Sequence, residues 1–240
     1  GAVGSAVEQA GSGNTRLTAA NLSFAGDFVV TGGELEAAAT EALAAARQLV
    51  VAQALLTVSV DDATGYGLGP DLAMQGGLFR LLNGSGDAVT ASLRDLDLAG
   101  GVIGSGLVAP GANSLVVKGS IAVSEDSVVS AGKVAFVDGG TAASPTQVSV
   151  AAGKTLFFTG TLADDQTALL PSAFDKRGAG TLQLSGDNSS MTGASVVTAG
   201  VLDVRHANAL GDGVATNPQT YQVAQTTVNG GILVSNQADF

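Results

Sequence analysis

Cysteine and tryptophan are absent from this chain, and histidine occurs once, as His206. Without cysteine the protein has no disulfides and no thiolate metal ligands, and one histidine does not complete the usual zinc ligand sets. Aromatic residues make up only 4% of the 240 residues and charged residues only 13%. The core must therefore be built from Val, Leu, Ile and Ala. We expect neither a cofactor nor a metal site.

Basic residues are also scarce, with ten Lys and Arg against 21 Asp and Glu and a formal charge of −11. The basic residues form no run, so a nucleic-acid-binding surface is not expected. The longest apolar stretch, near residues 43–56, is interrupted by Arg47, Gln48 and Gln53, which argues against a membrane span. No signal peptide begins at Gly1, so an exported form would be a mature or trimmed chain.

Glycine is abundant, with 34 residues, which is about twice its usual share. A long helical protein would not tolerate so much glycine, because glycine destabilises helix interiors; many short strands and tight turns are expected instead. No shift in composition divides the chain. We therefore expect residues 1–240 to form a single domain around one core.

Short alternating segments separated by glycine corners recur along the chain. Strands are expected at residues 16–18, 22–24, 28–30, 58–60, 78–82, 89–93, 96–98, 115–117, 121–123, 128–129, 134–137, 148–150, 156–158, 181–184, 196–197, 201–204, 227–228 and 232–234, with corner glycines at 119, 132, 153, 200 and 231. This unit of strand, glycine corner and strand favours an all-β fold, a right-handed parallel β-helix (a β-solenoid) with loops of variable length. The alternative is a β-sandwich, whose hairpins favour Asn-Gly and Asp-Gly turns; positions 83, 138 and 229 start only a few such pairs.

One α-helix is predicted at about residues 34–55. Thr31 and Glu34 have the spacing of a capping box, and Ala and Leu recur three or four residues apart through the segment. Glutamates lie early and Arg47 lies late, which is the order that the helix dipole favours. We interpret this helix as a cap or flank packed on the solenoid; the alternative is an element that projects outward and mediates assembly.

Residues 176–211 carry a spaced pattern of glycine, leucine and asparagine. Its positions are Gly178, Gly180, Leu182, Leu184, Gly186, Asn188, Gly193, Gly200, Leu202, Leu210 and Gly211. This pattern resembles the passenger-associated transport repeat, also called the autotransporter-associated β-strand repeat, of surface proteins that Gram-negative bacteria secrete through their own C-terminal barrel. The resemblance implies a parallel β-helix in a secreted protein, and it does not imply a catalytic activity. Four residues separate Asn188 from Gly193 where the family usually has three with a central tyrosine, and Met191 takes the place of that aromatic residue.

Enzymatic function requires groupings that are scarce here. His206 lies beside Arg205 and three residues after Asp203, but no Gly-x-Ser-x-Gly nucleophile motif is present. We expect His206 to be an exposed loop residue. The acidic pairs Asp61–Asp62, Asp95 with Asp97, and Asp164–Asp165 are interpreted as solvated turn residues rather than calcium ligands. The alternative interpretation of Asp95, Asp97, Asp164 and Asp165 is that they include a pair of carboxylates that cleaves sugars.

The function that follows is non-enzymatic and extracellular. The resemblance implies a passenger-like β-solenoid at the bacterial cell surface whose repeat at 176–211 assists secretion and folding, and which acts as a scaffold for an adhesin with a host or cell-surface ligand. Contact with the outer membrane would then run only through a barrel domain that is not in this chain. The alternative is a subunit of an extracellular fibre or sheath that polymerises head-to-tail through open β-helix ends, with the expected helix at 34–55 bridging subunits.

Overall fold

The structure is a computed structural model of the chain, and it describes residues 5–65, 67–82, 87–106, 113–137, 144–165, 168–211 and 226–235. Its strands are β1 (Ala6–Gln9), β2 (Asn14–Leu17), β3 (Asp27–Val30), β4 (Glu34–Ala37), β5 (Gln48–Ala52), β6 (Leu55–Val58), β7 (Asp71–Gln75), β8 (Leu78–Leu81), β9 (Thr90–Leu93), β10 (Leu96–Ser105), β11 (Ser114–Val117), β12 (Ile121–Ser130), β13 (Lys133–Phe136), β14 (Thr146–Val150), β15 (Thr155–Phe158), β16 (Thr161–Leu162), β17 (Phe174–Arg177), β18 (Thr181–Leu184), β19 (Ser195–Val197), β20 (Val201–Val204), β21 (Thr226–Val228) and β22 (Ile232–Ser235).

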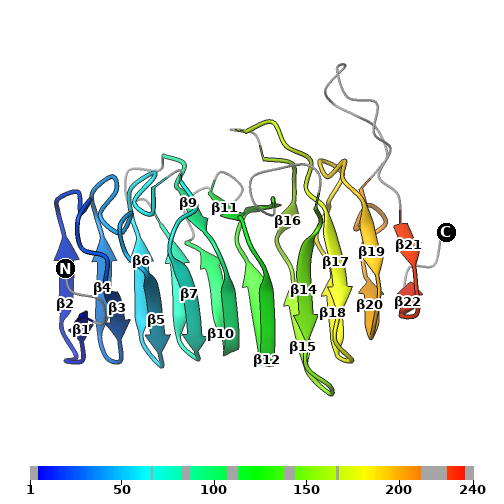
Figure 1. Ribbon diagram of the computed structural model, residues 1–240, viewed down its shortest axis with the longest axis horizontal. Helices are drawn as coiled ribbons and strands as arrows, with labels where there is room; N and C mark the ends of the chain where they lie inside the picture. Colours follow the sequence, from blue (N-terminus) through cyan, green and yellow to red (C-terminus); the bar gives the residue numbers. More distant parts are fainter. Residues whose placement is uncertain are drawn as a thin grey trace.

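Strands of successive turns lie side by side and pair in parallel, so the chain forms a β-solenoid (Figure 1). The first face is the ladder β1, β3, β5, β7, β10, β12, β14, β17, β19 and β21. The second face is the ladder β2, β4, β6, β8, β10, β12, β15, β18, β20 and β22. The long strands β10 and β12 run through both faces. We call each turn of the solenoid a level.

A third face covers only the middle of the solenoid. It consists of β9, β11, β13 and β16, which are also parallel. In the rest of the described chain, turns and loops close the third side (Figure 1). The described residues contain no helix that is long and apolar enough to cross a membrane.

The core is a continuous column of aliphatic side chains between the faces. In β18, for example, Leu182 and Leu184 are buried while the alternate residues are partly exposed, because successive strand residues point to opposite sides. Three phenylalanines stack in one part of the column. Phe136 lies edge-to-face against Phe158 and Phe174, with ring centroids 5.7 and 6.4 Å apart.

The predicted helix at residues 34–55 is wrong. The segment contains β4, a turn at residues 40–45, β5 and the start of β6. Glu41 has φ 58°, which lies in the left-handed region and is incompatible with an α-helix. No helix occurs anywhere in the described ranges.

Pairing with neighbouring levels explains why the helical pattern fails. Leu35 and Ala37 are buried and alternate with partly exposed Glu34 and Glu36, as in a strand with one buried face. Each strand here pairs on both sides, whereas the helix propensity of Ala, Leu and Glu differs from that of other ordinary residues by at most about 0.7 kcal/mol each. Thr31 makes no capping box, since its hydroxyl donates to Oε1 of Glu8 at 3.3 Å.

The parallel β-helix prediction is confirmed, and the sandwich alternative is wrong. All pairings between the named strands are parallel. Asn229-Gly230 forms no hairpin, because it joins β21 to β22 on a different face; the pairs that begin at 83 and 138 lie outside the described residues. The strand predicted at 22–24 is wrong, since that segment lies in the turn between β2 and β3.

Candidate functional site

The corner between the first and second faces of the level formed by β17 and β18 is built from glycine. Gly178 has φ +69° and Gly200, one level later, has φ +71°. A Cβ on Gly200 would lie 2.3 Å from the carbonyl oxygen of Gly178 and 2.4 Å from that of Gly180. The backbones of successive corners are therefore in direct contact, which only glycine permits.

A lysine fills the inside of this corner. Lys176 is fully buried, and its Nζ donates to the carbonyl oxygens of Arg177 at 2.5 Å, Gly178 at 2.9 Å and Ala199 at 3.2 Å. Burial lowers the pKa of Lys176 from its ordinary value of 10.5 to about 8, and the Asp175 carboxylate opposes that shift.

In the turn after β18, the asparagine Asn188 forms hydrogen bonds with the level before and the level after its own. The Asn188 side chain is fully buried; its Oδ1 accepts from the amide of Leu162 at 2.7 Å, and its Nδ2 donates to the carbonyl oxygen of Ala209 at 2.6 Å. Leu162 belongs to the level before and Ala209 to the level after. Loss of this side chain would leave a buried donor and a buried acceptor without partners, which costs about 1–3 kcal/mol each.

The remaining residues of the predicted repeat lie in the core, at close approaches between backbones, or in a turn. Leu182, Leu184 and Leu202 are buried in the core, and Leu210 packs against it. A Cβ on Gly186 would lie 1.9 Å from the carbonyl oxygen of Gly160, and one on Gly193 would lie 2.1 Å from that of Ser172. Gly211 has φ +83° and donates its amide to the carbonyl oxygen of Asn208 at 3.0 Å. Gly186 and Gly193 thus lie where the backbones of two levels meet, and Gly211 lies in a turn within its own level.

The acidic pairs mostly bind neighbouring backbone. Oδ1 of Asp61 accepts from the amide of Thr90 at 2.8 Å, and Oδ1 of Asp95 accepts from the amide of Ser120 at 2.7 Å. Asp97 is exposed. The solvated-turn prediction is wrong for Asp165, which is buried in an antiparallel bridge with Leu170.

Asp164 is held by residues of two later segments. Its Oδ1 accepts from the amides of Ser172 at 2.9 Å and Thr192 at 3.0 Å, and its Oδ2 accepts from the Thr192 hydroxyl at 2.6 Å. His206 is partly exposed in the turn after β20, where its Nδ1 accepts from the amide of Asn208 at 3.2 Å. Among the residues that the structure describes, no three His, Asp or Glu side chains are grouped to hold a metal ion.

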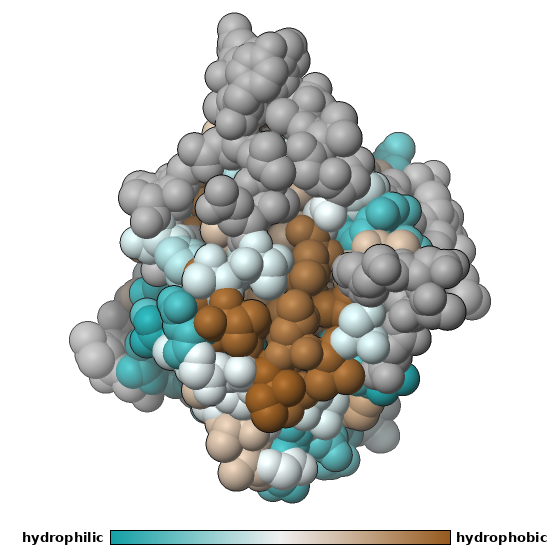
Figure 2. Space-filling model, turned by 90° about the vertical axis from the view of Figure 1, so that its right-hand side faces the viewer, coloured by the Kyte–Doolittle hydropathy of each residue, from teal (hydrophilic) through white to brown (hydrophobic). Residues whose placement is uncertain are grey.

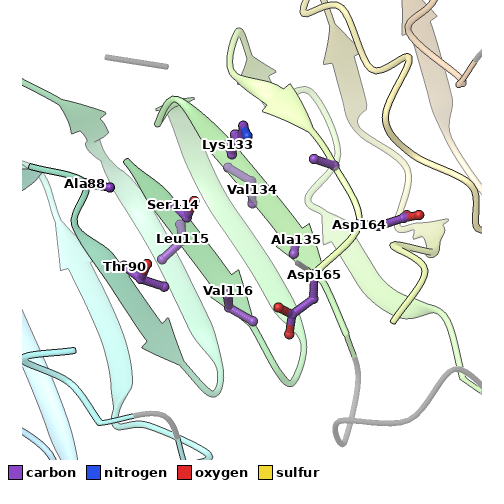
Figure 3. A pocket seen from close by; sticks show the side chains of 11 residues that line it. Ala88, Thr90, Ser114, Leu115, Val116, Lys133, Val134, Ala135, Asp164 and Asp165 are labelled. Carbon is purple, nitrogen blue, oxygen red and sulfur yellow. The ribbon is translucent and has the colours of Figure 1, made fainter. Parts of the chain in front are cut away.

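A shallow hollow of about 200 Å³ lies on the outside of the third face (Figure 3). Its floor includes Val116 and Ala135, and Lys133 and Asp165 lie toward opposite ends of it. Thr90, Ser114 and Lys133 occupy one register row across three levels. The hollow contains no histidine, and its two carboxylates, Asp164 and Asp165, both accept backbone amides.

Comparison with protein-family models matches two segments, residues 7–37 and 174–204, to the passenger-associated-transport-repeat. The chain contains two passenger-associated transport repeats. Together with the β-solenoid fold, they fit the passenger of an autotransporter. No curated protein and no solved structure matches the chain.

The two repeats are both 31 residues long (7–37 and 174–204), and each residue of the first corresponds to the residue 167 positions later (174 − 7 = 167). Equivalent pairs include Gly11 and Gly178, Gly13 and Gly180, Asn21 and Asn188, Gly26 and Gly193, Gly33 and Gly200, and Leu35 and Leu202. Both repeats have four residues between the asparagine and the next glycine. The first repeat carries an aromatic residue, Phe24, where the second has Met191.

The first repeat was not predicted from the sequence because several of its marker residues are replaced. Gln9 stands in the place of Lys176, Thr15 in the place of Leu182, and Ala19 in the place of Gly186. The equal spacing of the glycine pair, the asparagine and the later glycines was the signal that could have identified it.

The contact between glycine corners predicts a large effect of Gly200→Ala. A Cβ at this position meets two carbonyl oxygens and the Lys176 ammonium, the last at 2.8 Å. Gly153→Ala is the matched control, because Gly153 has almost the same φ, +72°, with nothing within 4 Å of its Cβ position. We expect the control to lose about 1–2 kcal/mol from left-handed strain alone and Gly200→Ala to lose clearly more in urea unfolding. Equal losses would contradict close contact between the corners.

Proposed function

We propose that this chain is part of a secreted autotransporter passenger at the bacterial cell surface, and that its second repeat is the nucleus on which levels stack during folding and export. The observation that carries the proposal is the set of buried polar contacts in this repeat that reach adjacent levels. Asn188 binds the levels on both sides, and Lys176 binds the following one. A level with such contacts presents a defined template to its neighbours.

The physical basis is nearest-neighbour stacking. In a solenoid each repeat contacts only the repeats beside it, so order can begin at one level and propagate. Each added level completes backbone hydrogen bonds and covers the exposed end of the aliphatic column. A nucleus outside the cell would thereby favour outward movement of the rest of the chain.

The proposed role is non-enzymatic. In support of it, the carboxylates of Asp61, Asp95, Asp164 and Asp165 accept hydrogen bonds from backbone amides, and His206 is bonded within its own turn. A rigid solenoid of this kind provides a scaffold that holds a binding surface away from the cell. We therefore include an adhesin role, with a ligand on a host or neighbouring cell, in the proposal.

Folding kinetics of matched leucine variants test the nucleus. Leu202 in the second repeat and Leu35 in the first are equivalent and equally buried, and truncation of either to Ala is expected to cost about 2–5 kcal/mol. If the second repeat is the nucleus, Leu202→Ala should mainly slow folding and Leu35→Ala should mainly accelerate unfolding.

Stopped-flow refolding and unfolding of the whole chain measure both rates. Leu182→Asp and Leu202→Asp should also refold more slowly than the parent. Parent-like refolding of these variants, or slower folding only for Leu35→Ala, would refute the nucleus.

A second candidate function, an end-to-end polymer, is favoured by the solenoid end at β21 and β22. Figure 2 views this end and shows an apolar area in its middle. Val228, Ile232 and Leu233 are 45%, 58% and 41% exposed, although they are strand residues. A second copy that stacked its β1 and β2 on this end would continue both ladders in the same direction, which is a contact that does not close. The bridging helix expected at 34–55 is not part of this candidate, because the segment is strand and turn.

Negative-stain electron microscopy of the purified chain at increasing concentration distinguishes the two candidates. The passenger proposal predicts discrete short rods at all concentrations. Long regular filaments that shorten when Leu233 is replaced by Asp would favour the polymer, since a charge at the stacking surface opposes contact between copies.

A further inference from the structure

Apolar stacking alone does not determine how the levels of this solenoid align. The inward residues of neighbouring strands are similar aliphatic side chains, and a slip of two residues keeps them pointing inward. Yet β19 pairs with β17 in one register, with Asp175 beside Val196 and Lys176 beside Val197. Some feature with a specific partner must select that register.

Lys176 has the required position. It occupies the inward row between Val148 on the level before and Val197 on the level after, both of which are fully buried. An ammonium group in such a row is unfavourable unless every donor finds an acceptor. Two acceptors come from its own corner, and the third is the carbonyl oxygen of Ala199 on the next level.

The contact with Ala199 is reciprocal. The amide of Ala199 donates to the carbonyl oxygen of Lys176 at 3.1 Å, while the Lys176 ammonium donates to the carbonyl oxygen of Ala199 at 3.2 Å. A slip of two residues would displace the carbonyl oxygen by about 6.6 Å and leave the ammonium short of a partner. Gly200 provides the room for Nζ, because a Cβ there would lie 2.8 Å from it.

The equivalent position in the first repeat shows what the ammonium adds. Gln9 donates its Nε2 to the carbonyl oxygens of Gly11 at 2.8 Å and Gly13 at 3.3 Å, both in its own corner. Within the described residues, the Gln9 side chain makes no hydrogen bond to the following level's corner. A neutral amide thus completes the corner, and the longer lysine also reaches the next level.

We propose that Lys176 is a register-selecting residue: its buried ammonium specifies how β19 and β20 stack on β17 and β18, at a cost in stability. The inference concerns the alignment of levels and stands apart from the proposed role in secretion. This role explains why a buried charge lies in the aliphatic column, although both neighbours of Lys176 in its row, Val148 and Val197, are aliphatic.

The charged neighbours of Lys176 lie on its own strand. Asp175 accepts from the hydroxyl of Thr198 and from Arg177, so both of its carboxylate oxygens are bound. Val148 from β14 and Val197 from β19 are the residues in register with Lys176 on either side, and neither titrates. Lys176 releases its proton at lower pH in the folded chain than in the unfolded chain, so the unfolded state binds more protons between about pH 8 and 10.5. Stability should therefore rise with pH in that window.

Three variants of the whole chain test the proposal. Lys176→Met removes all donors, Lys176→Gln copies the first repeat and keeps only the corner contacts, and Gln9→Met is the control at the equivalent site. We expect both Lys176 variants to give more than one set of amide signals for residues 195–204 in ¹H–¹⁵N NMR spectra. The parent and Gln9→Met should give one set. A folded Lys176→Gln protein with a single set of signals would overturn the proposal, even if Lys176→Met fails to fold.

Unfolding in urea at several pH values gives a second readout. Between pH 7 and 10 the parent should gain up to roughly a hundredfold in its ratio of folded to unfolded chain, and Lys176→Gln should lose most of that gain. The variant is compared with the parent because burial also lowers the pKa of Lys118. An undiminished gain in Lys176→Gln would show that Lys176 does not bear a buried charge, which contradicts the proposal.

Discussion

Parallel pairing between successive turns is the constraint on which this structure depends. A strand in the solenoid takes its hydrogen-bond partners from the level before and the level after, so no level satisfies its own backbone. This requirement accounts for the glycine corners. Where the chain turns at the same place on successive levels, the backbones of those levels come into contact, and only glycine leaves room for that contact. The pairing requirement also leaves the loops free to vary in length, which explains the irregular spacing of the corners along the sequence.

Polar residues inside the solenoid have a different role from the aliphatic column. The column supplies most of the burial, but its side chains are similar from level to level. Asn188 and Lys176 accept or donate only where a particular backbone group of another level is in place. Asn113 makes a similar link in the middle of the solenoid, between the amide of Val89 and the carbonyl oxygen of Leu81. Such residues make the alignment of levels specific.

Most of the fold was predictable because period-2 alternation and glycine corners both report directly on strands and turns. The strands in the segment at 34–55 were not predictable. Its alanines, leucines and glutamates favour a helix locally, and only pairing with the adjacent levels stabilises strands instead. The first repeat was hidden by substitutions such as Gln9 in the place of Lys176, which keeps the hydrogen bonds within the corner but changes the residue. The burial of Lys176 and Asp165 was also unpredictable. Lys176 binds the carbonyl oxygen of Ala199, which is distant in the sequence, and Asp165 is buried by a bridge with Leu170 that no sequence pattern indicates.

Pulse-labelling hydrogen exchange during refolding tests the central claim most directly, because it reports when each level acquires its inter-level hydrogen bonds. The account predicts that amides of β17 to β20 become protected first and that protection then spreads to levels farther along the solenoid. Earlier protection of β3 to β8, with β17 to β20 following, would contradict a nucleus in the second repeat. Simultaneous protection of all levels would contradict level-by-level stacking.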